Sequence, residues 1–259
     1  MIDLSFSIYE LEFFLLVMTR VTCFIYAAPF FGMNSVPNRV KIGVGVFISY
    51  IIYQGLTPME LLYNSVLGFA VIVIKEAFTG ILIGFSANIC TTILNFAGHL
   101  VDTEIGLSMA SLFDPVTKEN VTLTGVYYQY SVLMLLMISG MYQYVLGAIC
   151  ESFNLIPVNG AIFSSENLVL CMTEFLGDYI SIGFRICLPV FVCILLLNAV
   201  LGILAKVSPQ LNMFAVGIQL KILTGFAILF LTVSLLPSAS TLILSEIKKM
   251  VTAFTEALL

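Results

Sequence analysis

The sequence is poor in charged residues. Asp, Glu, Lys and Arg make up 10% of the 259 residues, whereas hydrophobic residues make up 60%. Soluble domains have about 25% charged and about 45–50% apolar residues. A water-soluble domain of this length cannot hide so much apolar surface in one core. Much of the surface must therefore face lipid or other apolar protein, and the chain is predicted to be membrane-associated.

Positive charge is scarcer than negative charge. The formal net charge is −5 and the isoelectric point is near 4.8. Proteins that bind nucleic acid select Lys and Arg to neutralise phosphates, so no nucleic-acid partner is expected. The N-terminal segment carries Asp3, Glu10 and Glu12 without a Lys or Arg. A cleaved signal peptide begins with a basic region, so the first apolar run is expected to remain in the protein.

The sequence also lacks the motifs of an enzyme or a cofactor site. It contains no G-x-S-x-G, H-E-x-x-H, P-loop or G-x-G-x-x-G pattern. The single histidine, His99, lies three residues before Asp102 and is interpreted as hydrogen-bonded near a helix end. The six cysteines lie in apolar stretches without C-x-x-C spacing and are interpreted as small buried apolar residues. No catalytic residue, metal ligand or cofactor is predicted.

Long apolar runs occupy most of the chain. A bilayer core of about 30 Å needs roughly 20 helical residues, which predicts an all-α, membrane-associated fold. Runs 42–56 and 61–74 are too short to cross singly, and Thr57-Pro58 between them indicates a turn, so a helical hairpin or re-entrant pair is predicted. Run 168–205 is long enough for two helices, with a break expected at Asp178, Arg185 or Pro189. The runs are 13–33, 42–56, 61–74, 77–101, 123–150, 168–205 and 211–236.

The run 77–101 carries small and polar residues at steps of three and four, which places them on one helical face. The G-x-x-x-G pair within it allows close approach of another helix, and its amides can bond across helices. The stripe is expected to pack inside the chain or to face a wet lumen or a partner subunit, and not lipid. It consists of Gly80, Gly84, Asn88, Thr91, Asn95, Gly98 and Asp102.

Ionisable residues inside apolar runs are costly, so each is expected to have a partner. Most interior charges here are basic and most acids lie at run edges, which favours pairing between helices or subunits over an ion pathway. The candidate pairing residues, with the polar residues of the stripe, are Arg20, Lys75, Glu76, Asn88, Asn95, Asp102, Arg185, Lys206, Asn212 and Lys221.

The segment 106–122 mixes turn residues with large apolar ones. A merely solvated connector would be more polar, so these side chains are expected to pack against something. Met adapts to changing neighbours, and apolar constrictions can close a pore by excluding water. A loop packed on its own helices remains the alternative. Its acidic residues, with Arg39, Lys41, Lys248 and Lys249 placed inside, put this loop and the N-terminus outside the cytoplasm.

Several motifs, in this order and spacing, resemble those of the flagellar biosynthetic protein FliR family. This family supplies the export-gate subunit that virulence type III secretion systems share. The motifs run nearly end to end: Arg20; Ala28-Pro-Phe-Phe-Gly32; Val36-Pro-Asn-Arg-Val-Lys41; Lys75 to Gly84; Ala97-Gly-His-Leu-Val-Asp102; Gly106 to Pro115; Leu188-Pro189; Asn198 to Lys206; and Ser208 to Gly217.

The resemblance implies a single-domain subunit, residues 1–259, of a ring-like helical complex. Its partners would be FliP and FliQ family subunits, with one copy of this chain, and an FlhB family protein. Its cargo would be unfolded export substrates crossing the bacterial inner membrane at the flagellar basal body. Much of the assembly would be raised toward the outer face. Helices 1–105 and 123–259 would flank a channel plug at 106–122, with the plug residues Gly106, Leu107, Ser108, Met109, Leu112, Phe113, Asp114 and Pro115.

The chain departs from the family pattern at three places. Ser139-Gly140-Met141 stands where Asn-Gly-His is frequent, Lys206 stands where Arg is common, and Gln219 stands where Pro is frequent. The first departure lies in the turn 139–143. The virulence-secretion counterpart is the nearest alternative function. A multipass solute transporter and an intramembrane enzyme are the more distant ones.

Overall fold

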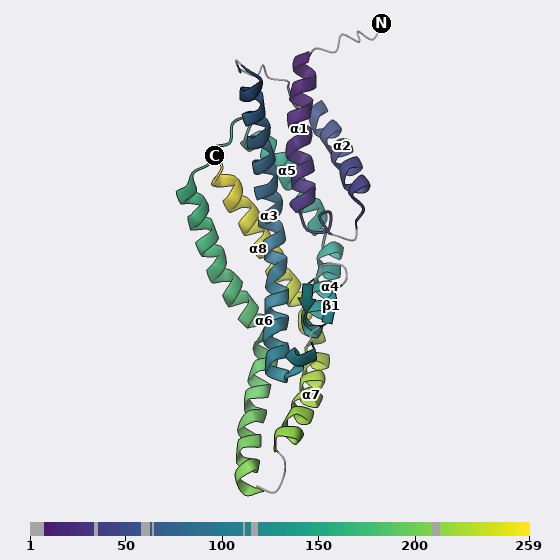
Figure 1. The fold of residues 1–259 in the computed structure, drawn as a ribbon, viewed down its shortest axis with the longest axis vertical. Coiled ribbons are helices and arrows are strands. Elements are labelled where there is room, and N and C mark those ends of the chain that lie inside the picture. The colour runs from purple at the N-terminus through teal and green to yellow at the C-terminus, as the bar shows by residue number, and fades with distance from the viewer. Residues whose placement is uncertain are drawn as a thin grey trace. The chain divides into compact units, whose positions relative to one another are not determined.

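The computed structural model describes residues 8–33, 36–57, 63, 65–110, 112–114, 119–208 and 213–259. Helices dominate this part of the chain, which confirms the predicted all-α class (Figure 1). One short pair of strands was not expected. The elements are α1 (Ile8–Ala27), α2 (Asn38–Gly55), α3 (Val66–Ile105), η1 (Leu107–Ala110), β1 (Leu112–Asp114), β2 (Glu119–Val121), α4 (Leu123–Ile138), α5 (Met141–Leu155), α6 (Ser165–Val207), α7 (Met213–Thr232), η2 (Val233–Leu235) and α8 (Leu236–Glu256).

The chain forms two compact units. Unit 1 comprises residues 1–89, 140–174 and 246–259, and unit 2 comprises residues 90–139 and 175–245. The long helices α3, α6 and α8 each contribute residues to both units. The sequence-based division at 106–122 therefore differs from the division by packing, and the single export-gate domain stays a prediction.

Three helical stretches of the described residues are long and apolar enough to cross a membrane. They are 66–105, 165–207 and 215–256. The helices α4 and α5 make a fourth candidate if they are counted together as one broken span. Lengths of 40 to 43 residues exceed the roughly 20 that one crossing needs. Each stretch therefore has enough length to extend beyond the hydrocarbon layer.

The predicted pair 42–56 and 61–74 is wrong in its second member. The first run is α2, which ends at Gly55, but the second continues through Lys75 and Glu76 into α3. Glu76 does not interrupt the helix because its carboxylate is buried in an ion pair. The turn expected at Thr57-Pro58 falls partly on Pro58, which lies outside the described residues.

Three further boundaries differ from the sequence prediction. No break occurs at Asp178, Arg185 or Pro189, because α6 is one helix of 43 residues with Pro189 inside it. The run 123–150 is instead divided at Ser139-Gly140, where Gly140 has φ = 80°, a conformation that glycine adopts without steric cost. The last run continues beyond 236 through η2 into α8.

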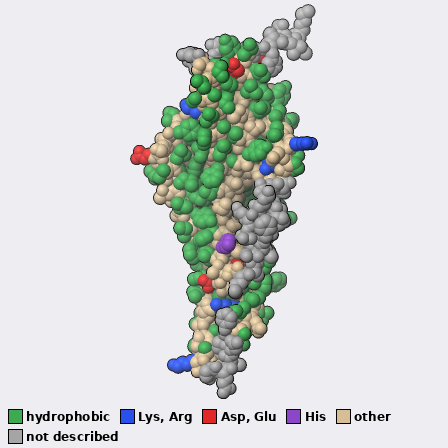
Figure 2. Space-filling view, in the orientation of Figure 1, with side chains coloured by type: hydrophobic (Ala, Val, Ile, Leu, Met, Phe, Trp, Pro, Cys, Tyr) green, Lys and Arg blue, Asp and Glu red, His purple; other side chains and the backbone are tan. Residues whose placement is uncertain are grey.

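Large apolar side chains remain exposed on many helices. Hydrophobic atoms cover broad areas of the face shown in Figure 2, and charged ones are few. Phe47 on α2 is 66% exposed, Ile203 on α6 is 66% exposed and Phe230 on α7 is 80% exposed. Exposed apolar surface of this extent marks contact with lipid or with other proteins.

Candidate functional site

The loop between α3 and α4 begins at a glycine that ends the helix. Gly106 has φ = 89°, and its N–H donates to the carbonyl oxygen of Asp102 over 3.0 Å. A left-handed glycine after the last helical residue is a common helix terminator. At the other end of the loop, Thr122 is extended and precedes α4. The loop therefore runs from the glycine that ends α3 to the threonine that precedes α4.

The two ends of the loop are joined by Asp102 and Thr124. The Asp102 carboxylate accepts the backbone N–H of Thr124 over 3.1 Å and also accepts its hydroxyl. The same hydroxyl lies 2.8 Å from the carbonyl oxygen of Gly98. Asp102 is fully buried, and Thr124 is nearly so. We call these three residues the stem of the loop.

Two glycines allow the stem to close. A Cβ at Gly98 on α3 would collide with the backbone of Gly125 on α4. The two helices therefore approach backbone to backbone where their ends are joined. Such close contact between helices requires small residues on the touching faces.

Between the stem residues the chain forms η1 and a short antiparallel hairpin. Leu112 pairs with Val121, Phe113 with Asn120 and Asp114 with Glu119. Of the predicted plug residues, Gly106, Leu107, Ser108 and Met109 lie at the end of α3 and in η1, and Leu112, Phe113 and Asp114 lie in β1. Pro115 lies outside the described residues, as does the turn that Asp114-Pro115 was expected to fix.

The polar stripe of α3 packs largely within the chain. A Cβ at Gly80 would collide with the carbonyl oxygen of Arg20 on α1, and one at Gly84 would lie 2.7 Å from that of Phe24. Thr91 is buried, whereas Asn88 is exposed. At 100° per residue, Asn88 lies about 80° round the helix from Gly80 and so at the edge of the stripe. The stripe is a packing face with one polar residue at its border.

A buried ionic cluster in unit 1 joins α1, α3 and the end of α5. Arg20 Nε lies 2.5 Å from Glu76 Oε2, and Arg20 Nη2 lies 3.0 Å from Glu76 Oε1, with both side chains fully buried. Arg20 also donates to the carbonyl oxygens of Ser152, Ile156 and Pro157. These five bonds use all five N–H donors of the guanidinium. Asn159 N–H donates to Glu76 over 2.8 Å.

The cluster also lies at the C-terminal end of a helix. Ser152 is in the last turn of α5, and Ile156 follows its last residue. Carbonyl groups at a helix C-terminus carry partial negative charge, which a cation stabilises. The ring of Phe153 lies 4.3 Å from the guanidinium carbon. Arg20 is therefore paired between helices of its own chain.

The other candidate pairing residues occupy varied positions. Lys75, Asn95 and Lys221 are half-buried, and Arg185 and Lys206 are exposed on α6. Asn212 lies outside the described residues. The structure therefore places only Arg20, Glu76 and Asp102 in the buried clusters described above.

Sequence reasoning missed several partners in these clusters. Thr124 and Gly125 were not singled out, although Thr122-Leu-Thr124 before an apolar run is a helix-start signal that could have indicated them. Ile156 and Pro157, which accept from Arg20 through their backbone carbonyl oxygens, have side chains that do not indicate a partner for an arginine. The expectation that all cysteines are buried is wrong for Cys150 and Cys193, which are exposed. Within the described residues, no three His, Cys, Asp or Glu side chains could hold a metal ion.

These features describe a helical membrane-associated protein organised around a loop with joined ends. The chain matches Bacterial export proteins, family 1, over residues 11–247, and it belongs to that family. It is 29% identical over 226 residues to the flagellar biosynthetic protein FliR of Bacillus subtilis (strain 168), covering 86% of each chain. The match to FliR of Escherichia coli (strain K12) is 27% over 232 residues, covering 89% of this chain and 87% of that one.

A third relative gives the same result. FliR of Aquifex aeolicus (strain VF5) is 27% identical over 224 residues, covering 86% of this chain and 85% of that one. The resemblance to the FliR family seen in the sequence motifs is thereby confirmed.

Proposed function

We propose that this chain is a non-enzymatic subunit of the flagellar type III protein export gate, and that its loop 106–122 plugs the export channel. Unfolded flagellar proteins would cross the inner membrane at the basal body through this gate. Energy would be supplied elsewhere in the apparatus. The flagellar role is supported by the family and by the names of its relatives.

The plug assignment rests on the joined stem. The bonds between Asp102 and Thr124 hold the two ends of segment 106–122 at one buried point, so this segment, here called the lobe, cannot extend as a free linker. The lobe carries Leu107, Met109, Leu112 and Phe113. Apolar side chains at a constriction exclude water and thereby block ions. A lobe of this composition can seal a channel while retaining a fixed base.

The exposed apolar helices support a role inside a larger complex. We propose FliP and FliQ family subunits as the covering partners, with an FlhB family protein beside them. The paired charges of Arg20 and Glu76 would act within this subunit by fixing α1 against α3. Charge reversal at either residue should block assembly because unit 1 would lose its buried ionic cluster.

The plug is tested by ion leakage in cells that carry the complete apparatus. Phe113→Ala, or deletion of 109–113, should raise the leak while secretion of flagellar proteins persists. Thr117→Ala, in the same loop, serves as the control because it removes no large apolar side chain. An unchanged leak in the deletion variant would remove the plug assignment. Normal motility after deletion of the whole gene would remove the flagellar role.

A further inference from the structure

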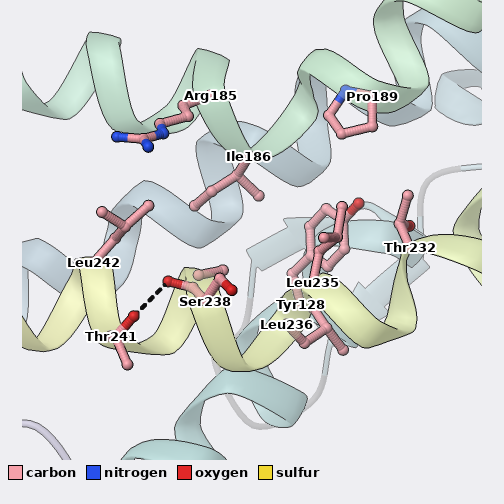
Figure 3. A pocket seen from close by; sticks show the side chains of 11 residues that line it. Tyr128, Arg185, Ile186, Pro189, Thr232, Leu235, Leu236, Ser238, Thr241 and Leu242 are labelled. Atoms are coloured by element: carbon pink, nitrogen blue, oxygen red, sulfur yellow. Dashed lines mark hydrogen bonds between the residues drawn. The ribbon is translucent and has the colours of Figure 1, made fainter.

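A cavity of about 390 Å³ lies in unit 2 between α6 and α8. Arg185 and Pro189 line it from α6, and Ser238, Thr241 and Leu242 line it from α8 on the opposite side (Figure 3). Tyr128 of α4 lines it as well. The site thus combines one cation and several hydroxyl groups with apolar side chains.

Arg185 gives the cavity an unusual polar end. Its side chain is exposed, and in the part of the chain that the structure describes it makes no ion pair. Pro189 has no N–H, so the carbonyl oxygen of Arg185 lacks the helical donor four residues on. The cavity therefore offers a cationic donor on α6 beside hydroxyl oxygens on α8. A ligand that bears an anion and an O–H or N–H group would match both.

The charge pattern of α6 sets the depth of Arg185 in a bilayer. The interval 186–205 carries no charged side chain and is bounded by Arg185 and Lys206. As a helix of about 20 residues it is roughly 30 Å long, the thickness of the hydrocarbon core. Large side chains along it are exposed, including Leu196 at 63%. Arg185 then lies at the level of the lipid phosphates, with its stem able to reach them.

We propose that this cavity binds an anionic glycerophospholipid such as phosphatidylglycerol. The phosphodiester would accept hydrogen bonds from the Arg185 guanidinium, whose planar fork matches phosphate oxygens. The Ser238 and Thr241 hydroxyls lie on the facing helix. Thr241 already donates to the Ser238 carbonyl, and its oxygen is still able to accept a glycerol hydroxyl. An acyl chain would lie along Leu235 and Leu236, at the end of the cavity that Pro189 lines.

Lipid is favoured over a carboxylate from a neighbouring helix for a specific reason. A carboxylate satisfies the guanidinium but brings no O–H or N–H donor for the hydroxyl oxygens of Ser238 and Thr241. A phosphatidylglycerol headgroup supplies the anion and a hydroxyl donor together. The uncharged interval beginning at Ile186 also places the site where such headgroups are concentrated.

The test is native mass spectrometry of the purified full chain in detergent. Dioleoyl-phosphatidylglycerol and dioleoyl-phosphatidylcholine are added in equal amounts. The chain should retain the anionic lipid about tenfold more, the size expected for one charge-assisted contact. Arg185→Gln should reduce this ratio to near one, and Arg185→Lys should keep part of it. Lys206→Gln, at the other end of the uncharged interval, should leave the ratio unchanged.

Two further measurements separate the other sources of the signal. Inorganic phosphate should not displace the lipid, because it lacks the acyl chain; full displacement would overturn the proposal. A photo-crosslinking residue at Leu235 should give lipid adducts in cells, and a protein adduct in their place would also overturn it. An unchanged lipid ratio in Arg185→Gln, with helical content and unfolding temperature equal to those of the parent, would count equally against it.

Discussion

Thr124 donates both its backbone N–H and its hydroxyl to the carboxylate of Asp102. These bonds join the last turn of α3 to the first turn of α4. An acid in the last turns of a helix opposes the dipole of that helix, whereas an acid at a helix start is favourable. Asp102 is therefore unfavourable for α3 and favourable for α4. Its placement is explained by the second helix and by the need to join the two.

Removal of this joint should open the base of the loop. Asp102→Ala leaves the buried N–H of Thr124 unpaired, at a cost of about 1–3 kcal/mol. Lys118 is the only Lys or Arg between Lys75 and Arg185 in the sequence, so trypsin cleavage there reports on the loop. Cleavage of the purified chain should become about tenfold faster, which corresponds to about 1.4 kcal/mol of local opening.

Glu104→Ala is the matched control for this cleavage experiment, since Glu104 is on the same turn of α3 but only half-buried. Its cleavage rate should stay near that of the parent chain. Equal rates for Asp102→Ala and the parent would show that the stem does not hold the loop.

The contact between Gly98 and Gly125 should tolerate no side chain. Gly98→Ala places a methyl group against the backbone of α4, and overpacking of this kind costs about 1–3 kcal/mol. Gly147→Ala on α5 meets no heavy atom within 4 Å and should stabilise its helix by about 0.5–1 kcal/mol. Thermal unfolding in detergent should therefore shift in opposite directions for the two variants. A shift in the same direction would contradict the close approach.

Arg20 should be among the most sensitive positions in unit 1. Arg20→Met leaves the buried Glu76 carboxylate without its cation, and breaking a buried ion pair costs about 3–5 kcal/mol. Arg39→Met, on the exposed face of α2, should cost less than about 0.5 kcal/mol. The measurement is the yield of folded chain and its denaturant midpoint.

Exchange of the charges of Arg20 and Glu76 tests whether the backbone carbonyl groups around Arg20 contribute to stability as well as the ion pair. The double variant Arg20→Glu with Glu76→Arg should not recover stability, because a carboxylate at position 20 would face the carbonyl oxygens of Ile156 and Pro157. Full recovery would mean that these carbonyls contribute little.

Tyr63 should add an alkaline pH dependence. Its hydroxyl donates to Glu12 Oε1 over 2.6 Å, and this bond, followed by desolvation, raises the pKa of Tyr63 above its usual value. A raised pKa means that the folded chain holds the proton more tightly. The contribution to stability is present below about pH 10, the ordinary tyrosine value, and is lost as the pH rises through the raised pKa.

Tyr63→Phe should remove this part of the alkaline loss of stability, as measured by unfolding between pH 9 and pH 12. Tyr50→Phe, at an exposed site of α2, provides the comparison. Identical pH profiles for the parent and Tyr63→Phe would show that the bond to Glu12 does not form in solution.

The apolar runs were sufficient to predict the helical class and the close approach at Gly80 and Gly84, because spacing alone determines which residues share a helical face. They were not sufficient to predict where helices end. Two adjacent charged residues, Lys75 and Glu76, resemble a helix boundary unless the ion pair of Glu76 is known. Its partner, Arg20, lies 56 positions earlier in the chain. Distant pairing of this kind leaves no local signal.

Two other boundaries depended on backbone chemistry. Pro189 did not interrupt α6, because only the Arg185 carbonyl loses its helical donor and apolar helices tolerate such losses where other groups compensate. Ser139-Gly140 did interrupt the apolar run 123–150. Ser-Gly is a recognised turn signal, but the length of the run favoured one continuous helix. The short hairpin after Leu112 could not be foreseen, since two three-residue strands are too brief for an alternating pattern.

Every nitrogen-bound proton on the guanidinium of Arg20 is already engaged inside this polypeptide. A neighbouring molecule that docks against unit 1 would therefore find no free N–H donor on the Arg20 guanidinium. The contacts of Arg20 with α3 and the end of α5 can therefore form before a partner protein binds, and binding of that partner need not break them.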